Sequence, residues 1–215
     1  MADQPTRKRR ANGEESRVKI LDAATEIAGE RGYEGTSIAL VSKKCGLPAS
    51  SIYWHFKDKD DLIAAVIERS FADWLAAWDL PDGPSATERI SRVGAQVAKA
   101  LQNSPDFLRL GLMLALERRP EEPRAREVFL RVRNEAKARL ADIVTEVRPG
   151  LPAEAVDQIA TYALAAGDGL FIAKEIEGDA VDLSAMLEIH VQALLAFASV
   201  IPDTVATDTG TGSAD

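Results

Sequence analysis

Apolar side chains recur along most of the chain with the three-to-four-residue spacing of an α-helix. In the first such segment, positions 20, 21, 24, 27 and 28 share one helical face, and Asn12 with Glu15 resembles an N-terminal capping box. Comparable stripes predict further helices near residues 37–45, 48–56, 59–78, 86–102, 105–117, 124–148, 153–177 and 183–201. Strand-like alternation is missing. We therefore expect an all-α fold of three short helices followed by about six longer ones.

Glycine and proline mark the ends of these segments. Gly32 is expected to end the first helix and Gly46 the second, each in a left-handed conformation. Pro48 suits the first turn of the third helix, where its missing N–H is not needed. Asp58 is placed to cap the fourth helix. Pro81-Asp82-Gly83-Pro84 is a strong break, so the helices after it form a separate series.

Charge is spread unevenly over the 215 residues. The formal net charge is −8, but residues 1–60 carry 11 basic and 9 acidic side chains, while the remainder carries 15 and 25. A polyanion could therefore approach the N-terminal part and would be repelled by the rest. The single cysteine, Cys45, excludes an intrachain disulfide. We identify no secretory signal and no apolar run that would span a bilayer, so a cytoplasmic protein with no membrane partner is expected.

The second and third helices and the turn between them have the pattern of a helix-turn-helix. The third helix begins with Ala49, Ser50 and Ser51, whose small side chains would allow close approach to base edges in a major groove. Tyr53 and His55 could donate to flanking phosphates. The alternative is a set of ordinary packing helices. The third helix also contains Trp54, which is either core or exposed; exposure is favoured because Tyr53 and Phe56 already supply inward aromatics.

The segment "RGYEGTSIALVSKKCGLPASSIYWHFKDKDDL", residues 31–62, resembles the N-terminal domain of the TetR family of bacterial transcriptional repressors. It contains the family's glycine-aromatic turn, a threonine, a short helix ending in glycine, a recognition helix ending in Tyr-x-His-Phe, and a lysine that opens the next helix. Two positions depart from the pattern. Pro48 stands where the family often has a capping serine, and Cys45 where alanine is usual.

The resemblance implies a role for each matching residue. Phosphate contacts are implied for Thr36, Tyr53, His55 and Lys59, and the positions nearest the bases are Pro48, Ala49, Ser50 and Trp54. Ser37 and Ser51 complete the expected DNA-binding set. Phe56 and Leu62 would pack the small core. Because few long polar side chains stand at the base-reading positions, contact with thymine methyls and DNA shape are expected to contribute to discrimination.

The resemblance also implies a division of the chain. We expect a disordered basic arm over 1–11, a helix-turn-helix DNA-binding domain over 12–58, a ligand-binding and dimerisation domain over 59–201, and a disordered tail over 202–215. The basic run at 7–10 is either a solvated tail or an arm that reaches into a minor groove.

A small-molecule pocket among the later helices is a further implication of the resemblance. The segment 107–116 is apolar nearly all round, and it is either a central core helix or a pocket wall. The candidate ligand-binding residues are Trp74, Trp78, Phe107, Leu110, Met113, Leu114, Phe129, Tyr162, Asp168 and Phe171. Their aromatic and aliphatic character favours a mainly apolar ligand. His190, among aliphatic neighbours, is a packing or interface residue, or alternatively a ligand-binding or metal-binding one.

These observations together predict a homodimeric repressor that a small molecule releases from a palindromic operator. The resemblance implies that the last two helices form the dimer contact, and their apolar stripes agree with this. No nucleotide-binding glycine loop, metal-ligand cluster or convergent catalytic set is recognisable, so we expect no cofactor, no metal and no enzymatic activity. The competing class is a helical ligand-binding protein or enzyme without DNA binding.

Overall fold

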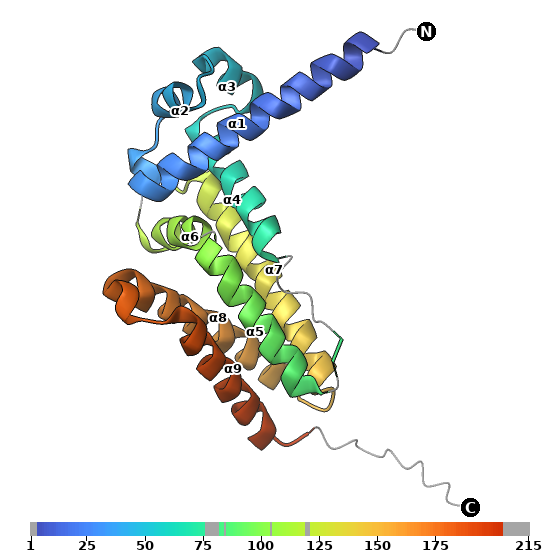
Figure 1. Cartoon of the computed structure of the whole chain (residues 1–215). Helices are drawn as coiled ribbons and strands as arrows, with labels where there is room; N and C mark the ends of the chain where they lie inside the picture. The colour runs from blue at the N-terminus through green and yellow to red at the C-terminus, as the bar shows by residue number, and fades with distance from the viewer. Residues whose placement is uncertain (1–3, 76–81, 84, 104, 119–120, 204–215) are drawn as a thin grey trace, which may run out of the picture. The chain divides into compact units, whose positions relative to one another are not determined.

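The computed structural model describes residues 4–75, 82–83, 85–103, 105–118 and 121–203 (Figure 1). This part of the chain contains nine α-helices, one short 3-10 helix and no strand, as predicted. The α-helices are α1 (Gln4–Gly35), α2 (Ile38–Cys45), α3 (Ala49–His55), α4 (Lys59–Leu75), α5 (Ala86–Asn103), α6 (Asp106–Leu116), α7 (Arg124–Val147), α8 (Ala153–Glu177) and α9 (Leu183–Val200).

The chain forms two compact units. Unit 1 comprises residues 1–79 and 96–136, and unit 2 comprises residues 80–95 and 137–215. Two helices, α5 and α7, therefore contribute residues to both units. The predicted domain boundary between residues 58 and 59 is not a boundary between compact units, because α4 packs against α1 and α6 within unit 1.

The first helices of unit 1 enclose a small apolar core. Its buried members include the predicted Phe56 and Leu62, together with residues from one face of each contributing helix: Ile20, Leu21, Ala23, Ala24, Ile27, Val41, Ile52 and Val66. A second group in the same unit is aromatic. The ring of Phe107 lies 5.8 Å from those of Phe71 and Trp74 and 6.0 Å from that of Phe129. These rings hold α4, α6 and α7 together.

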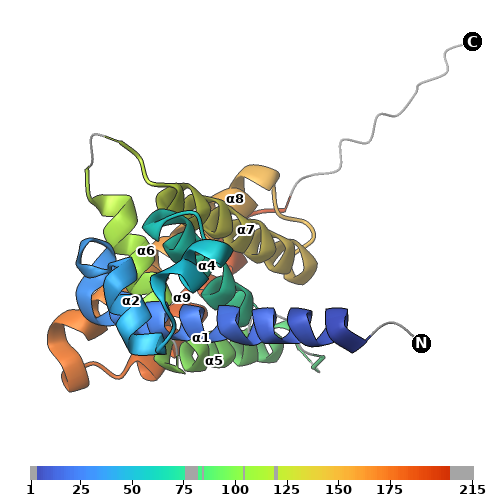
Figure 2. The ribbon, with the colours of Figure 1, turned by 90° about the horizontal axis from the view of Figure 1, so that it is seen from above.

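Helix α1 is longer than predicted. Its backbone is helical from Gln4, so the predicted disordered arm is wrong for residues 4–11, and its first turns extend past α2 and α3 (Figures 1 and 2). Asn12 therefore lies inside the helix, where its carbonyl accepts a bond from Ser16 Oγ at 2.8 Å. The predicted interruption at Gly32 is present, with φ of 68° and ψ of −175°. Residues 1–3, and residues 204–215 of the predicted tail, lie outside the described residues.

The turn between α2 and α3 follows the predicted signals. Gly46 adopts the left-handed conformation, with φ of 71°, and its N–H donates to Ser42 O. Pro48 precedes α3 without a side-chain capping bond. Asp58 caps α4 as predicted, because its Oδ1 accepts from Asp61 N at 2.8 Å. Residues close in sequence thus determine where α3 and α4 begin.

In unit 2, α8 and α9 pack side by side (Figure 1). Asp182 caps the start of α9 by accepting from Ala185 N at 3.1 Å. The other end is held by Arg148, whose guanidinium donates to Ala198 O at 2.6 Å and pairs with Asp203 at 2.8 Å. A cation at the carbonyl end of a helix is favourably placed in its dipole.

Helix α9 is also unusually apolar. Over Leu183–Val200 its mean hydropathy is 1.6 and only 17% of the segment is buried, so by length and composition it could cross a membrane. The expectation that no apolar run is long enough is therefore wrong for α9 on these criteria. Glu188, His190 and Gln192 in the middle of the helix are polar, and charged groups at a bilayer centre are costly.

Candidate nucleic-acid interface

Helix α3 presents an exposed face formed by the residues expected to read DNA. Trp54 is 75% exposed and Tyr53 is 56% exposed, while Ile52 on the opposite side is fully buried. Pro48 and Ser50 are exposed, and Ala49, Ser51 and His55 are half-buried. The predicted exposure of Trp54 is confirmed. The face combines small residues at the N-terminal end of the helix with two aromatic side chains further along.

Trp54 is not isolated on this face. Its ring lies 4.5 Å from the His55 ring in an edge-to-face arrangement, and it also lies against α1 at Gly13. A Cβ at Gly13 would stand 3.6 Å from the Trp54 ring, which is ordinary contact distance. The side chain is therefore supported on one side while most of its surface stays open. A supported aromatic loses less rotamer freedom when it binds.

The pKa of His55 is lowered from the usual value, mainly because partial burial disfavours the charged imidazolium. The Arg17 guanidinium lowers the pKa further, and the Glu14 carboxylate opposes both effects. His55 is consequently neutral near pH 7. It can still donate one hydrogen bond to a phosphate, but it adds little positive charge.

Two predicted phosphate contacts are engaged within the protein. Thr36 is only 2% exposed, and its Oγ1 donates to Gly32 O at 2.8 Å, so its hydroxyl closes the end of α1. This geometry does not support the phosphate contact implied for Thr36. Ser37 caps α2 by accepting from Leu40 N at 3.3 Å. Both hydroxyls therefore shape the backbone that precedes α2.

Lys59 is also held inside unit 1. Its Nζ donates to Tyr33 O at 3.2 Å, lies 4.2 Å from the centre of the Tyr33 ring and pairs with Glu34 at 3.6 Å. An ammonium group has three donors, so a phosphate contact is possible alongside these. In this arrangement Lys59 fixes the end of α1 against the start of α4.

The exposed face includes residues that the family pattern did not single out. On α2, Ala39, Lys43 and Lys44 are exposed, and Lys44 pairs with Glu26 at 2.5 Å. Lys57, before α4, is exposed too. The net positive charge of residues 1–60 was the sequence signal that could have added the two lysines in the last turn of α2 to the predicted DNA-binding residues.

A cavity of about 250 Å³ lies within unit 2. Its lining is apolar apart from a few side chains, and it comes from four helices: Thr87 and Ile90 of α5; Leu140, Ile143, Val144 and Val147 of α7, with Arg148 just after it; Ile159 and Ala163 of α8; and Leu194, Leu195, Ala198 and Ser199 of α9. The α7 stripe at helical spacing was the sequence signal that could have identified this wall.

None of the predicted ligand-binding residues that the structure describes lines this cavity. In unit 1, Phe107, Leu110, Leu114 and Phe129 are buried in the core, Trp74 is half-buried among their rings and Met113 is exposed. In unit 2, Phe171 is buried, Asp168 is half-buried and Tyr162 is exposed. Trp78 lies outside the described residues. The rings from α4, α6 and α7 pack on one another, which favours the core-helix interpretation of residues 107–116.

His190 joins α9 to α8. Its Nε2 lies 3.1 Å from Ala163 O and therefore donates to that carbonyl, and its ring lies 6.1 Å from the Tyr162 ring. Burial lowers the pKa of His190 below the usual 6.5, and the bond to the Ala163 carbonyl partly offsets this effect. The structure thus supports the packing interpretation of this histidine.

The lowered pKa predicts a pH-dependent stability. Because the unfolded chain takes up the proton more readily, the His190 contribution is complete above about pH 6.5 and is lost as pH falls through the folded-state pKa. We expect the thermal midpoint of wild type to decrease on acidification below this pH. In a His190→Gln variant, which retains a donor but does not titrate, part of the decrease should disappear. His55→Gln, measured in the same way, controls for the other histidine; equal slopes for wild type and His190→Gln would contradict the assignment.

The helices around this face match a known sequence family. The profile described as "Bacterial regulatory proteins, tetR family" matches residues 20–66, which run from the first core positions of α1 into α4. The domain formed by these residues is thus a TetR-family domain. AcrR of Shigella flexneri, named as an HTH-type transcriptional regulator, is 39% identical over 64 residues, which cover 30% of each chain. The chain spans less than half the length of the curated relatives it matches.

Solved TetR-family structures share the fold over most of their length. The fatty acid degradation regulator FadR of Bacillus halodurans superposes with a TM-score of 0.69 at 18% identity, covering 84% of this chain and 94% of that chain. FadR of Bacillus subtilis, solved in complex with stearoyl-CoA, gives 0.67 at 20% identity, covering 83% and 97%. At these identities the likeness concerns the fold alone.

Proposed function

We propose that this chain is a DNA-binding transcriptional regulator, most simply a repressor, that responds to a small apolar molecule. The observation that carries the proposal is the exposed face of α3, on a domain that belongs to the TetR family. Four side chains of this face are exposed: Pro48, Ser50, Tyr53 and Trp54. Ile52, on the opposite side of the helix, is buried in the core. A short helix held in this way fits a major groove.

The proposed distribution of contacts follows from exposure. Ala49, Ser50 and Trp54 are assigned to base edges, and Tyr53, His55 and Lys59 to the sugar-phosphate backbone. Lys43, Lys44 and Lys57 add positive charge at the margin. Thr36 and Ser37 are assigned to shaping the start of α2. The protein would act in the cytoplasm, where the operator lies.

We further propose a homodimer formed through α8 and α9. These helices leave several large apolar side chains exposed: Tyr162, Ile172 and Ile176 on α8, and Ile189, Phe197 and Val200 on α9. Ile176 is 77% exposed. Apolar surface of this kind is rarely left uncovered in a monomer, and a second copy offers a matching surface through two-fold symmetry.

The dimer predicts a specific effect of one charge. Replacing Phe197 with glutamate should raise the dimer dissociation constant by at least about tenfold, because a carboxylate would be buried against apolar side chains of the second copy. Sedimentation velocity over a dilution series measures the effect. Leu116→Glu is the control, since Leu116 is also an exposed apolar residue (74%, against 47% for Phe197) but belongs to α6. A Phe197→Glu protein that dimerises like wild type would exclude this interface.

The cavity of unit 2 is the proposed effector site. Its volume of about 250 Å³ and apolar lining suit a small molecule or the apolar chain of a larger one. The stearoyl-CoA bound by the Bacillus subtilis regulator is a precedent for an acyl chain in this fold, and we propose the same broad class here.

Selection of DNA from a random pool tests the function directly. The proposal predicts enrichment of an inverted repeat, with half-sites about one helical turn or more apart, as two symmetry-related α3 helices require. Recovery of no preferred sequence would instead favour the competing class, a helical ligand-binding protein.

A further inference from the structure

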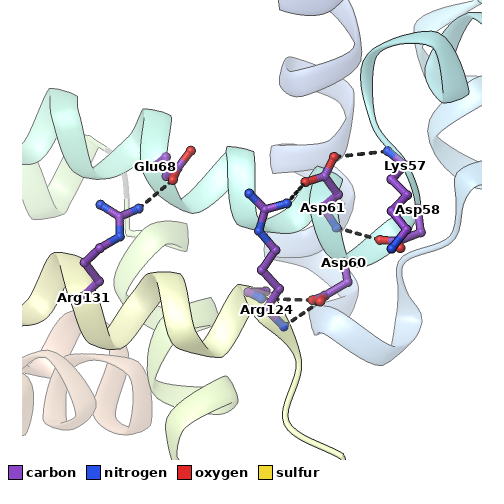
Figure 3. A network of polar contacts seen from close by, with 8 residues as sticks. Lys57, Asp58, Asp60, Asp61, Glu68, Arg124 and Arg131 are labelled. Carbon is purple, nitrogen blue, oxygen red and sulfur yellow. Dashed lines mark hydrogen bonds and ion pairs between the residues drawn. The ribbon is translucent and has the colours of Figure 1, made fainter.

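The Asp60 carboxylate joins three helices of unit 1. Asp60 stands in the first turn of α4, and its oxygens accept bonds from Arg124 N at 2.6 Å and Ala125 N at 3.0 Å, the first two amides of α7 (Figure 3). Oδ1 also accepts from the Tyr33 hydroxyl at 3.2 Å, at the end of α1. One side chain thus connects residues that are 27 and about 64 positions away in sequence.

The first amides of a helix have no partner within the helix and carry partial positive charge. A carboxylate at this place satisfies two of them and is stabilised by the helix dipole. The next amide of α7, Arg126 N, is satisfied by Pro123 O at 3.0 Å. The first two amides of α7 are therefore capped by α4, and the next two by the preceding residue Pro123.

Neighbouring contacts strengthen the junction at which α4 meets the end of α1 and the start of α7. The Arg124 side chain forms an ion pair with Asp61, which in turn accepts from Lys57 N at 3.1 Å (Figure 3). Lys59 lies over the Tyr33 ring and donates to the Tyr33 carbonyl. Consecutive residues of α4 thus hold Tyr33 at its ring and at its hydroxyl.

Tyr33 lies next to the interruption of α1 at Gly32, just before the turn that leads to α2. The position of this tyrosine consequently sets where α2 and α3 begin. At the other side of the junction, α7 continues without a break to Val147, and its residues Leu140, Ile143 and Val144 line the cavity of unit 2. One helix therefore contains both the cavity wall and the amides that Asp60 binds.

We propose that Asp60 is a positioning residue that fastens the first turn of α7 to the end of α1, so that the placement of the DNA-reading helices depends on α7. This inference rests on the proposed DNA-binding function. It assigns the control of that function to the contact between α4 and the start of α7. Movement of α7 then reaches Tyr33 through a single carboxylate.

Asp60 could act only as a cap that stabilises α7, or it could couple α7 to α1. The two roles predict different results for Tyr33→Phe. This variant keeps the ring under Lys59 and both Asp60 bonds to α7, and it removes the bond between Asp60 and the hydroxyl. If Asp60 couples the two helices, DNA affinity should fall about threefold while hydrogen exchange at the first α7 amides stays unchanged. Asp60→Ala should weaken affinity about tenfold, within the usual range of coupling between sites, and should speed exchange at those amides.

A double-mutant cycle decides whether the two residues act together. The Asp60→Ala/Tyr33→Phe protein should bind DNA no more weakly than Asp60→Ala alone, because the bond between the hydroxyl and Asp60 is already absent in the single variant. The control is Glu68→Gln, which removes the 2.6 Å ion pair with Arg131 elsewhere between α4 and α7 and should leave affinity unchanged (Figure 3).

Fluorescence anisotropy on the selected duplex, with circular dichroism to verify folding, provides the affinities. Wild-type affinity for Tyr33→Phe, or independent losses in the double variant, would overturn the coupling while leaving the DNA-binding proposal intact. If Asp60→Ala does not fold, the Tyr33→Phe measurement decides on its own, because that variant leaves both Asp60 bonds to α7 in place. If wild type itself binds no DNA, the proposed function fails and the coupling fails with it.

Discussion

Replacing Ser50 with glutamate is expected to reduce sequence-specific DNA affinity at least about a hundredfold, with no change in fold. Ser50 is exposed in the first turn of α3, where the small side chain would allow the helix to approach base edges. A glutamate there adds bulk and places a negative charge between two phosphate backbones. Two unfavourable effects therefore combine at the centre of the proposed contact.

The control for Ser50→Glu is the same charge at a different place in unit 1. Ala72 is an exposed residue of α4, and Ala72→Glu should bind DNA within about twofold of wild type because a distant exposed charge is screened. Anisotropy titrations at one salt concentration compare the three proteins. Equal losses for both variants would mean that overall charge, and not the α3 face, determines binding.

Replacing Gly111 with alanine is expected to destabilise the protein by about 1–3 kcal/mol, the usual cost of overpacking a core. A Cβ at this position of α6 would stand 2.0 Å from the Phe129 ring. Phe129 is only 1% exposed and its ring also contacts Phe107, so it has little room to move away. Chemical denaturation with a fixed slope measures the change in unfolding free energy.

Removing the obstructing ring should relieve part of this cost. In a Gly111→Ala/Phe129→Leu protein the two changes are expected to be non-additive, because the smaller side chain leaves space for the new methyl group. Strictly additive losses would contradict the proposed clash. A destabilised core would also lower DNA binding indirectly, so affinities of these variants are interpreted only where the protein is folded.

The helix-turn-helix could be predicted because its signals are local. Gly46 provides the left-handed turn, Pro48 directly precedes α3 and Asp58 caps α4, and each of these residues acts on its immediate neighbours. These residues needed no knowledge of distant contacts. The exposure of Trp54 was also predicted, but Tyr53, expected as an inward aromatic, is 56% exposed, and Ile52 is the buried side chain of α3 instead.

The start of α1 was predicted wrongly for a related reason. Asn12 and Gly13 have low helix propensity and are typical of a helix start. The structure continues the helix through them, with support from the bond between Ser16 and Asn12 O and the ion pair between Lys19 and Glu15 at 2.7 Å. Local propensity was outweighed by interactions one turn further along.

The ligand site could not be located from sequence because apolar residues do not reveal their partners. Phe107 and Phe129 suit a pocket wall and a packed core equally well, and the structure packs their rings 6.0 Å apart. The role of Asp60 was hidden for a similar reason. Its contacts with Tyr33 and the α7 amides join segments that are remote in sequence, and a helix-capping carboxylate from another helix leaves no local pattern.

The central claim is that the exposed face of α3 reads DNA sequence. Anisotropy titration of the wild-type protein against the selected duplex and a scrambled duplex, at 50 and at 200 mM salt (concentrations about fourfold apart), tests it most directly. We predict that the selected duplex binds at least about a thousandfold more tightly than the scrambled one, and that both affinities weaken as salt rises. Equal binding to the two duplexes, or no binding to either, would contradict the claim.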